Sequence, residues 1–171
     1  MVRKMRLRKS KHQKLFVPEA SQTFIVKRNI WTAFQYVAQN FFENHSRWDS
    51  NVILLTQTSR HKVGLGTTGR EIRQSPVGTI RGNIRVTKYK APNWFSFTIE
   101  SDHSIVEVEF TFTAREENCQ LNRMIKFTPK GWHRLLAPWI HFRLKRQSHQ
   151  TMDRLKSLLE SSHIPQSSVK L

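Results

Sequence analysis

The sequence predicts an α+β fold, a curved antiparallel sheet wrapped around one long C-terminal helix, with two short helices after the first strand. Apolar and polar side chains alternate along several segments between residues 52 and 128, which is typical of antiparallel strands with one face in water. After residue 131 the apolar side chains follow helical spacing instead. Turn residues separate the alternating segments, so the strands follow one another along the chain.

The first part of the domain is expected to hold one strand and two short helices. Residues 21–26 have the pattern of a short strand. Asn29 can cap a helix that begins at Ile30, because its side chain can accept a hydrogen bond from a free backbone N–H group of the first turn. A second short helix or turn covers about residues 40–47.

Six strands are expected next, over residues 52–58, 67–74, 79–89, 94–100, 105–113 and 120–128. In residues 105–113, Val108 and Phe110 share one face and Glu107 lies on the other. Arg123 breaks the rule in the last strand, because a charged side chain stands in its apolar row. Arg81 and Arg85 belong to the outer face of their strand, and the cations nearby are Arg73 and Lys88.

A long helix is expected from about residue 132 to 161, with Leu135, Trp139 and Phe142 on one apolar stripe and Leu155, Leu158 and Leu159 continuing an apolar side. Pro138 should kink or interrupt this helix near Arg134, because proline lacks an N–H group and its ring clashes with a preceding carbonyl. A cavity opens between sheet and helix wherever side chains do not fill the inner face.

The chain divides into a basic arm (1–18), one domain (19–161) and a C-terminal tail (162–171). It has 29 Lys+Arg against 12 Asp+Glu, a net charge of +17, which favours polyanions such as nucleic acid or anionic lipid. The expected polyanion contacts are Arg3, Lys4, Arg6, Arg8, Lys9, Arg143, Lys145 and Arg146. No apolar run reaches the roughly 20 residues of a membrane span, so we expect a cytoplasmic protein, with peripheral contact to an anionic membrane left open.

Familiar catalytic and metal-binding patterns are absent or wrongly placed. Residues 64–69 match G-x-G-x-x-G, but a strand follows and no acid lies between Glu71 and Glu100, which favours a hairpin over a dinucleotide loop. The histidines lack metal-ligand spacing, and acids beside Cys119 argue against a reactive thiolate. We expect no metal, no cofactor and no carboxylate pair inside the cavity. His45, at the expected rim, is a candidate acid or base, and enzymatic activity is not established.

Five short phrases occur in a specific order, at residues 29–34 (NIWTAF), 47–52 (RWDSNV), 63–67 (VGLGT), 88–92 (KYKAP) and 127–131 (FTPKG). Together they resemble the START-related helix-grip superfamily (SRPBCC), which includes polyketide cyclase/dehydrase-like proteins and lipid-transfer domains. The resemblance covers about residues 21–161. It implies a helix-grip fold with a pocket for an apolar or amphipathic small molecule between the sheet and the last helix.

The resemblance implies a pocket lined by Trp48, Phe97, Ile99, Val108, Phe110, Phe112, Arg123, Leu135, Trp139 and Phe142. Core packing is the plain alternative for nearly all of them. Arg123 can hold a ligand carboxylate or phosphate, reach water at the strand end, or pair with Glu100 or Asp102. The leading function is binding or transport of a small hydrophobic or lipid-like ligand. The alternatives are a cyclase/dehydrase-like enzyme in the same pocket and a basic polyanion-binding module; ligand identity and oligomeric state stay open.

Overall fold

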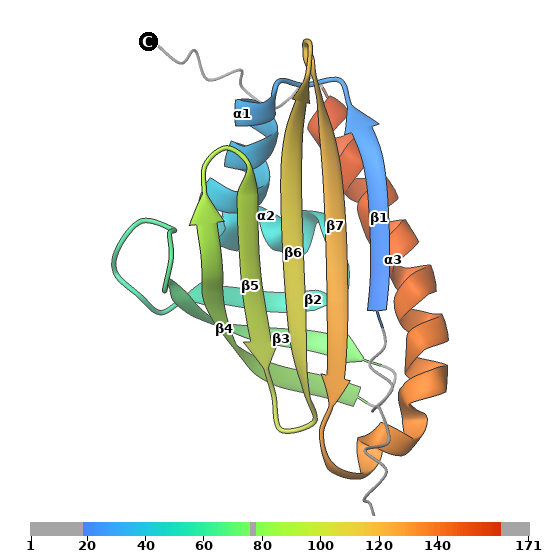
Figure 1. Ribbon diagram of the computed structural model, residues 1–171. Coiled ribbons are helices and arrows are strands. Elements are labelled where there is room, and N and C mark those ends of the chain that lie inside the picture. The colour runs from blue at the N-terminus through green and yellow to red at the C-terminus, as the bar shows by residue number, and fades with distance from the viewer. Residues whose placement is uncertain (1–18, 76–77, 162–171) are drawn as a thin grey trace, which may run out of the picture.

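The computed structural model describes residues 19–75 and 78–161, so the predicted basic arm and C-terminal tail lie outside the described residues. The elements in chain order are β1 (Glu19–Val26), α1 (Ile30–Phe34), a π-helical turn η1 (Gln35–Gln39), α2 (Phe41–Trp48), β2 (Val52–Gln57), β3 (Thr68–Ser75), β4 (Gly78–Lys90), β5 (Trp94–Glu100), β6 (Ser104–Arg115), β7 (Asn118–Pro129), a 3-10 helix η2 (Gly131–Leu136) and α3 (Ala137–Glu160). The strands form one antiparallel sheet in the order β1-β7-β6-β5-β4-β3-β2. The predicted fold class is confirmed (Figure 1).

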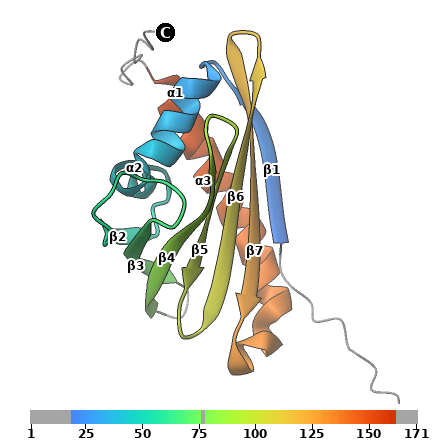
Figure 2. The same ribbon diagram turned by 60° about the vertical axis from the view of Figure 1, so that its left-hand side comes forward.

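The sheet curves strongly, and the helices lie on its concave side (Figures 1 and 2). Two observations explain how α1 and α2 are held there. The Asn29 side chain accepts a hydrogen bond of 2.8 Å from the backbone N–H of Thr32, as the sequence predicted. The buried Asn44 side chain donates to the Tyr36 carbonyl at 3.0 Å, which fixes α2 across the π-helical turn. The pair of helices thereby closes one end of the concave face.

Aromatic rings join these helices to the sheet. Phe34 on α1 meets Phe112 edge-on, with ring centroids 5.4 Å apart, and Phe41 on α2 meets Phe95 and Phe97 at 5.3 and 4.6 Å. Such tilted and edge-to-face contacts are the favoured geometry of aromatic pairs. Six of the residues that the resemblance placed along the pocket are buried: Trp48 on α2, and Phe97, Ile99, Val108, Phe110 and Phe112 on the sheet.

The long C-terminal helix begins later than predicted. Residues 131–136 form η2, and α3 starts at Ala137. Pro138 therefore lies in the first turn of α3 and not in the interior of a longer helix. A proline in the first turn has no intrahelical hydrogen bond to lose. The predicted kink near Arg134 is therefore a boundary between two helices.

The apolar stripe predicted on this helix exists, but it faces outward. The side of α3 that packs against the domain carries Ser148, Thr151, Met152, Leu155 and Leu159, all of them buried. Trp139 precedes Leu155 by 16 positions, which at about 100° per residue places it roughly 160° away around the helix. Accordingly Trp139 and Phe142 are 46% and 71% exposed, and Leu135, which lies on η2, is 83% exposed. The expectation that these three line the interior is corrected: Ser148 and Thr151, which look polar in sequence, occupy the packed side.

Candidate functional site

The concave face has a filled end and an open end. Beneath α1 and α2, aromatic rings fill the concave face, and these rings are buried. Toward the β5–β6 turn the same face continues through Ile80, Val106 and Phe127, which are only partly buried. A surface hollow of about 360 Å³ at this end is lined by Thr79, Ile80, Arg81, Asp102 and His103. We call this region, defined by Ile80, Val106 and Phe127, the open end.

Five polar side chains meet on the concave side between the filled and open ends. They are His45 on α2, Asp49 directly after it, Glu71 and Arg73 on β3, and Arg123 on β7. His45, Asp49, Glu71 and Arg123 are no more than 5% exposed, and the Arg73 side chain is 20% exposed. The sequence had singled out His45 and Arg123 from this polar cluster but not the other three.

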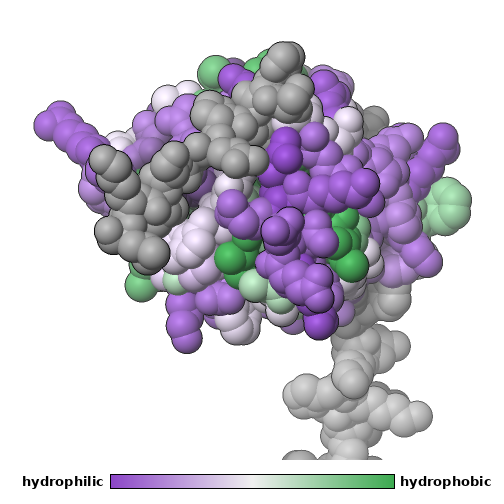
Figure 3. All heavy atoms as spheres, turned by 90° about the horizontal axis from the view of Figure 1, so that it is seen from above, coloured by the Kyte–Doolittle hydropathy of each residue, from purple (hydrophilic) through white to green (hydrophobic). Residues whose placement is uncertain are grey.

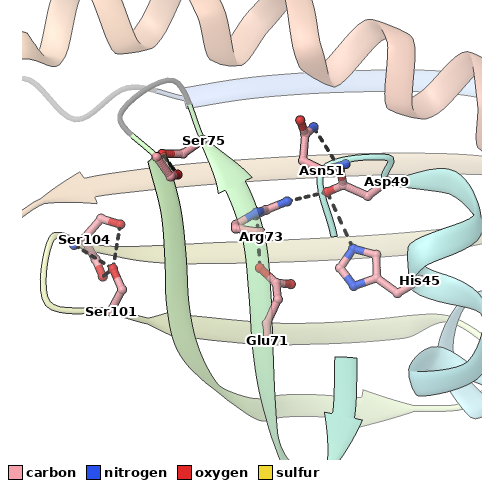
Figure 4. Close-up of polar contacts among 9 residues, drawn as sticks. His45, Asp49, Asn51, Glu71, Arg73, Ser75, Ser101 and Ser104 are labelled. Atoms are coloured by element: carbon pink, nitrogen blue, oxygen red, sulfur yellow. Dashed lines mark hydrogen bonds and ion pairs between the residues drawn. The ribbon is translucent and has the colours of Figure 1, made fainter. Parts of the chain in front are cut away.

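Asp49 is the centre of the polar cluster (Figure 4). Arg73 Nη2 donates to its carboxylate at 2.6 Å, and the backbone and side-chain N–H groups of Asn51 donate at 3.1 and 3.2 Å. His45 Nε2 lies 3.9 Å from the same carboxylate. Burial alone would raise the pKa of Asp49, but Arg73, His45 and Arg123 outweigh burial and hold that pKa well below its ordinary value. The buried Asp49 carboxyl is therefore ionised at neutral pH.

Glu71 is a second buried carboxyl, and Arg73 lies between it and Asp49 (Figure 4). Arg73 Nε is 3.2 Å from Glu71 Oε1, close enough for an ion pair, although the geometry is not that of a hydrogen bond. Burial raises the pKa of Glu71, Arg73 opposes this rise, and Asp49 adds to it. The expectation of no carboxylate pair in the interior was wrong. Arg73, grouped in sequence with outer-face cations, points inward because it shares the face of Glu71.

Arg123 is the interior cation that the alternation predicted. Its guanidinium lies 5.7 Å from the Phe110 ring, and its Nε and Nη1 atoms make no hydrogen bond within the described residues. Burial lowers the pKa of Arg123 to about 10, with Arg73 adding to the effect and Asp49 opposing it, so the group stays protonated at neutral pH. The suggested pairing with Glu100 or Asp102 is wrong: Glu100 pairs with Lys130 at 2.8 Å, and Asp102 is exposed.

His45 lies in the interior rather than at a rim. Its ring packs against Phe41, Trp48 and Phe97, with centroids 4.8, 5.2 and 5.7 Å away. Burial lowers the pKa of His45 to about 3; Arg73 and Arg123 act in the same direction and Asp49 against it. The imidazole is therefore neutral at physiological pH.

The neutral His45 makes stability depend on pH. Because its folded pKa is depressed, the unfolded chain takes up the proton first, and stability is lost as pH falls below the ordinary histidine value. Glu71, with a raised pKa, acts in the opposite sense, so the comparison needs a matched variant. When the pH is lowered from 7.5 to 5.5, the free energy of unfolding of His45→Leu should rise by about 1.4 kcal/mol relative to that of the native protein. Urea unfolding at both pH values measures this, and a constant difference between the two proteins contradicts it.

The remaining predicted residues fall outside the polar cluster. Arg81 and Arg85 lie on the outer face, and Arg143, Lys145 and Arg146 are exposed on α3. Cys119 is buried in β7 rather than in a loop, and burial raises the pKa of its thiol to about 11. Within the described residues no three histidine, cysteine or acidic side chains gather as a metal site.

Two glycines of 64–69 have distinct structural roles, Gly66 in the turn and Gly69 in packing. Gly66 has a left-handed backbone (φ 82°), and a side chain on Gly69 would clash with the Phe42 ring. This arrangement belongs to the β2–β3 connection, as predicted.

A family model described as "Polyketide cyclase / dehydrase and lipid transport" matches residues 18–160. The chain belongs to this family. A search of curated proteins finds no match to the sequence.

Three solved structures have the fold of this polyketide cyclase/dehydrase and lipid transport family member. The Zhui aromatase/cyclase of a Streptomyces species has a TM-score of 0.70 at 9% identity, covering 85% of this chain and 94% of its own. A Thermus thermophilus protein has a TM-score of 0.69 at 14% identity, and the match covers 83% of this chain and 97% of that protein. A START superfamily protein of Mycobacterium smegmatis has a TM-score of 0.64 at 15% identity, and the match covers 83% of this chain and 94% of that protein. At such identities the likeness establishes the helix-grip fold alone.

Proposed function

We propose that the protein binds a small amphipathic ligand whose acidic head is held by Arg123 and whose apolar body lies along the concave face toward the open end. The observation that carries this proposal is the buried Arg123 guanidinium with free donor atoms. Lipid transport in the description of the family supports the same class of ligand.

The charges of the polar cluster favour an anionic head. Asp49 and Arg73 compensate one another at 2.6 Å, and burial, which raises the pKa of Glu71, disfavours the charged form of that carboxyl. Among residues 19–75 and 78–161, Nε and Nη1 of Arg123 have no hydrogen-bond partner, and a buried charge that lacks a partner is costly. A carboxylate or phosphate placed against Nε and Nη1 would pair this charge and satisfy both donors at once.

The apolar body of the ligand has a surface to lie on. Ile80, Val106 and Phe127 continue the concave face beyond the polar cluster and keep part of their surface exposed. Transfer of such surface from water to a ligand contributes about 25 cal/mol per Å². Head and body would thus be recognised by different parts of one face.

Arg123→Met should weaken binding of a fluorescent fatty acid by about 10- to 100-fold, because a hydrogen-bonded charge contributes roughly 1.5–3 kcal/mol. The methyl ester of the same probe is the matched control, and both proteins should bind it equally. Fluorescence titration measures all four affinities. Equal binding of acid and ester by the native protein would contradict the assignment of the head to Arg123.

Glu71 favours one second candidate, the cyclase/dehydrase-like enzyme. A buried carboxyl with raised pKa beside Arg73 and a neutral imidazole are groups that general acid and base catalysis requires. Mass spectrometry of ligand extracted from the purified protein, before and after incubation with fresh protein, tests this function. Conversion that is lost in Glu71→Gln while binding persists would support the enzyme; no conversion would leave binding alone.

A further inference from the structure

We propose that η2 and the first turns of α3 form a face that docks on an anionic lipid bilayer. Four large apolar side chains define this docking face: Trp132, Leu135, Trp139 and Phe142, which are 66%, 83%, 46% and 71% exposed. Scattered exposed apolar residues are ordinary on a protein surface, but four within eleven positions of one segment are not. Docking by this face would not require the proposed ligand.

The docking face is not a displaced part of the core. Trp139 and Phe142 lie on the side of α3 opposite the buried stripe of Met152, Leu155 and Leu159. Rotating the helix to bury them would expose that stripe. Their exposure is thus a lasting property of this packing, and it calls for a partner outside the domain.

The charge around the docking face indicates what the partner is. The sequence has no Asp or Glu from Asn118 to Met152, whereas Arg134, Arg143, Lys145 and Arg146 are all exposed. Arg143 lies over the Trp139 ring, with its guanidinium carbon 5.0 Å from the ring centroid. Aromatic rings beside cations suit the headgroup region of a membrane, where rings insert and cations meet anionic lipid. A second copy of this chain would bring like charges together instead.

Contact with the bilayer would be peripheral, since no helix among residues 19–75 and 78–161 is long and apolar enough to cross it. The exposed side chains of Leu135 and Phe142 favour lipid over nucleic acid, because phosphate backbones offer them nothing to bury against. The opposite end of the molecule, seen from above, presents mostly hydrophilic side chains (Figure 3). η2 lies at the same end of the sheet as the β5–β6 turn, so docking would bring the open end toward the membrane (Figure 1).

Co-sedimentation of the full chain with vesicles tests the proposal. We expect binding to vesicles of phosphatidylcholine mixed with phosphatidylserine and at least tenfold weaker binding to phosphatidylcholine alone. The variant Leu135→Ser/Trp139→Ser/Phe142→Ser should bind the mixed vesicles at least tenfold more weakly and unfold at an unchanged temperature. The matched control is Ile53→Ser/Leu54→Ser, which removes exposed apolar residues from β2 and should bind as the native protein does.

Three outcomes would overturn the proposal. The triple variant could bind mixed vesicles as the native protein does, which would assign binding to other basic residues. It could lose affinity for a single-stranded oligonucleotide but not for vesicles. It could be a monomer while the native protein sediments as a dimer, which would make the face an interface between copies. The triple variant should still bind the fluorescent fatty acid with native affinity, so failure of docking and failure of ligand binding are distinguishable.

Discussion

Replacing Asp49 with alanine should lower the free energy of unfolding by about 3–5 kcal/mol, the usual cost of breaking a buried ion pair on one side. The carboxylate accepts from Arg73 at 2.6 Å and from Asn51, and it also faces His45. Without it, Arg73 and Arg123 would remain as cations in an interior with one acid, Glu71, whose raised pKa disfavours its charge. Urea unfolding followed by tryptophan fluorescence measures the loss.

The double variant Asp49→Ala/Arg73→Met is the control for this prediction. The double variant removes both charges of the Asp49–Arg73 pair, so neither is left buried without the other, and its loss of stability should be smaller than the sum of the two single losses. A loss below about 1 kcal/mol in Asp49→Ala would mean that water reaches the pair and replaces the carboxylate.

Phe41→Ala should destabilise the protein by about 3–5 kcal/mol, because it leaves a cavity at the junction of α2 and the sheet. The ring is fully buried and lies within 5.3 Å, centroid to centroid, of the rings of Phe42, His45, Phe95 and Phe97. Thermal unfolding measured by calorimetry gives the size of the effect.

Phe142→Ala is the matched comparison for Phe41→Ala. It deletes the same ring from a position that is 71% exposed, so the change should stay within about 0.5 kcal/mol. Similar losses at the two positions would contradict the outward orientation of the Phe142 side chain.

The strands of the sheet could be predicted closely because β5, β6 and β7 have one face toward solvent and the other toward the core. The period of two then marks both the strand and its inner face, and Arg123 stood out as a charge in a dry row. The same logic failed on β3, whose inner row holds Gly69, Glu71 and Arg73 and no apolar residue. A charged inner row looks like a wet face when only the sequence is read.

The polar cluster could not be predicted because its members lie far apart in the chain. Curvature of the sheet brings Glu71 and Arg73 on β3 to the same interior as Arg123 on β7, and sequence spacing does not encode this curvature. His45 was expected at the rim of the cavity, whereas α2 places its ring in the interior against aromatic rings. The sequence of α3 has two apolar sides, and the polar residues Ser148 and Thr151 made the packed side difficult to recognise.

The pairing of β1 with β7 has a consequence for how the chain is made. A hydrogen bond between the side chains of Ser21 and Asn122 joins residues 101 positions apart, whereas β2 through β6 each pair with the strand next in sequence. At about 5–20 residues per second, β1 leaves the ribosome roughly 5–20 s before its partner is complete. The hairpins can form as they emerge, but β1 waits with both edges unpaired. We therefore expect nascent chains stalled before Asn118 to be aggregation-prone and to need chaperones.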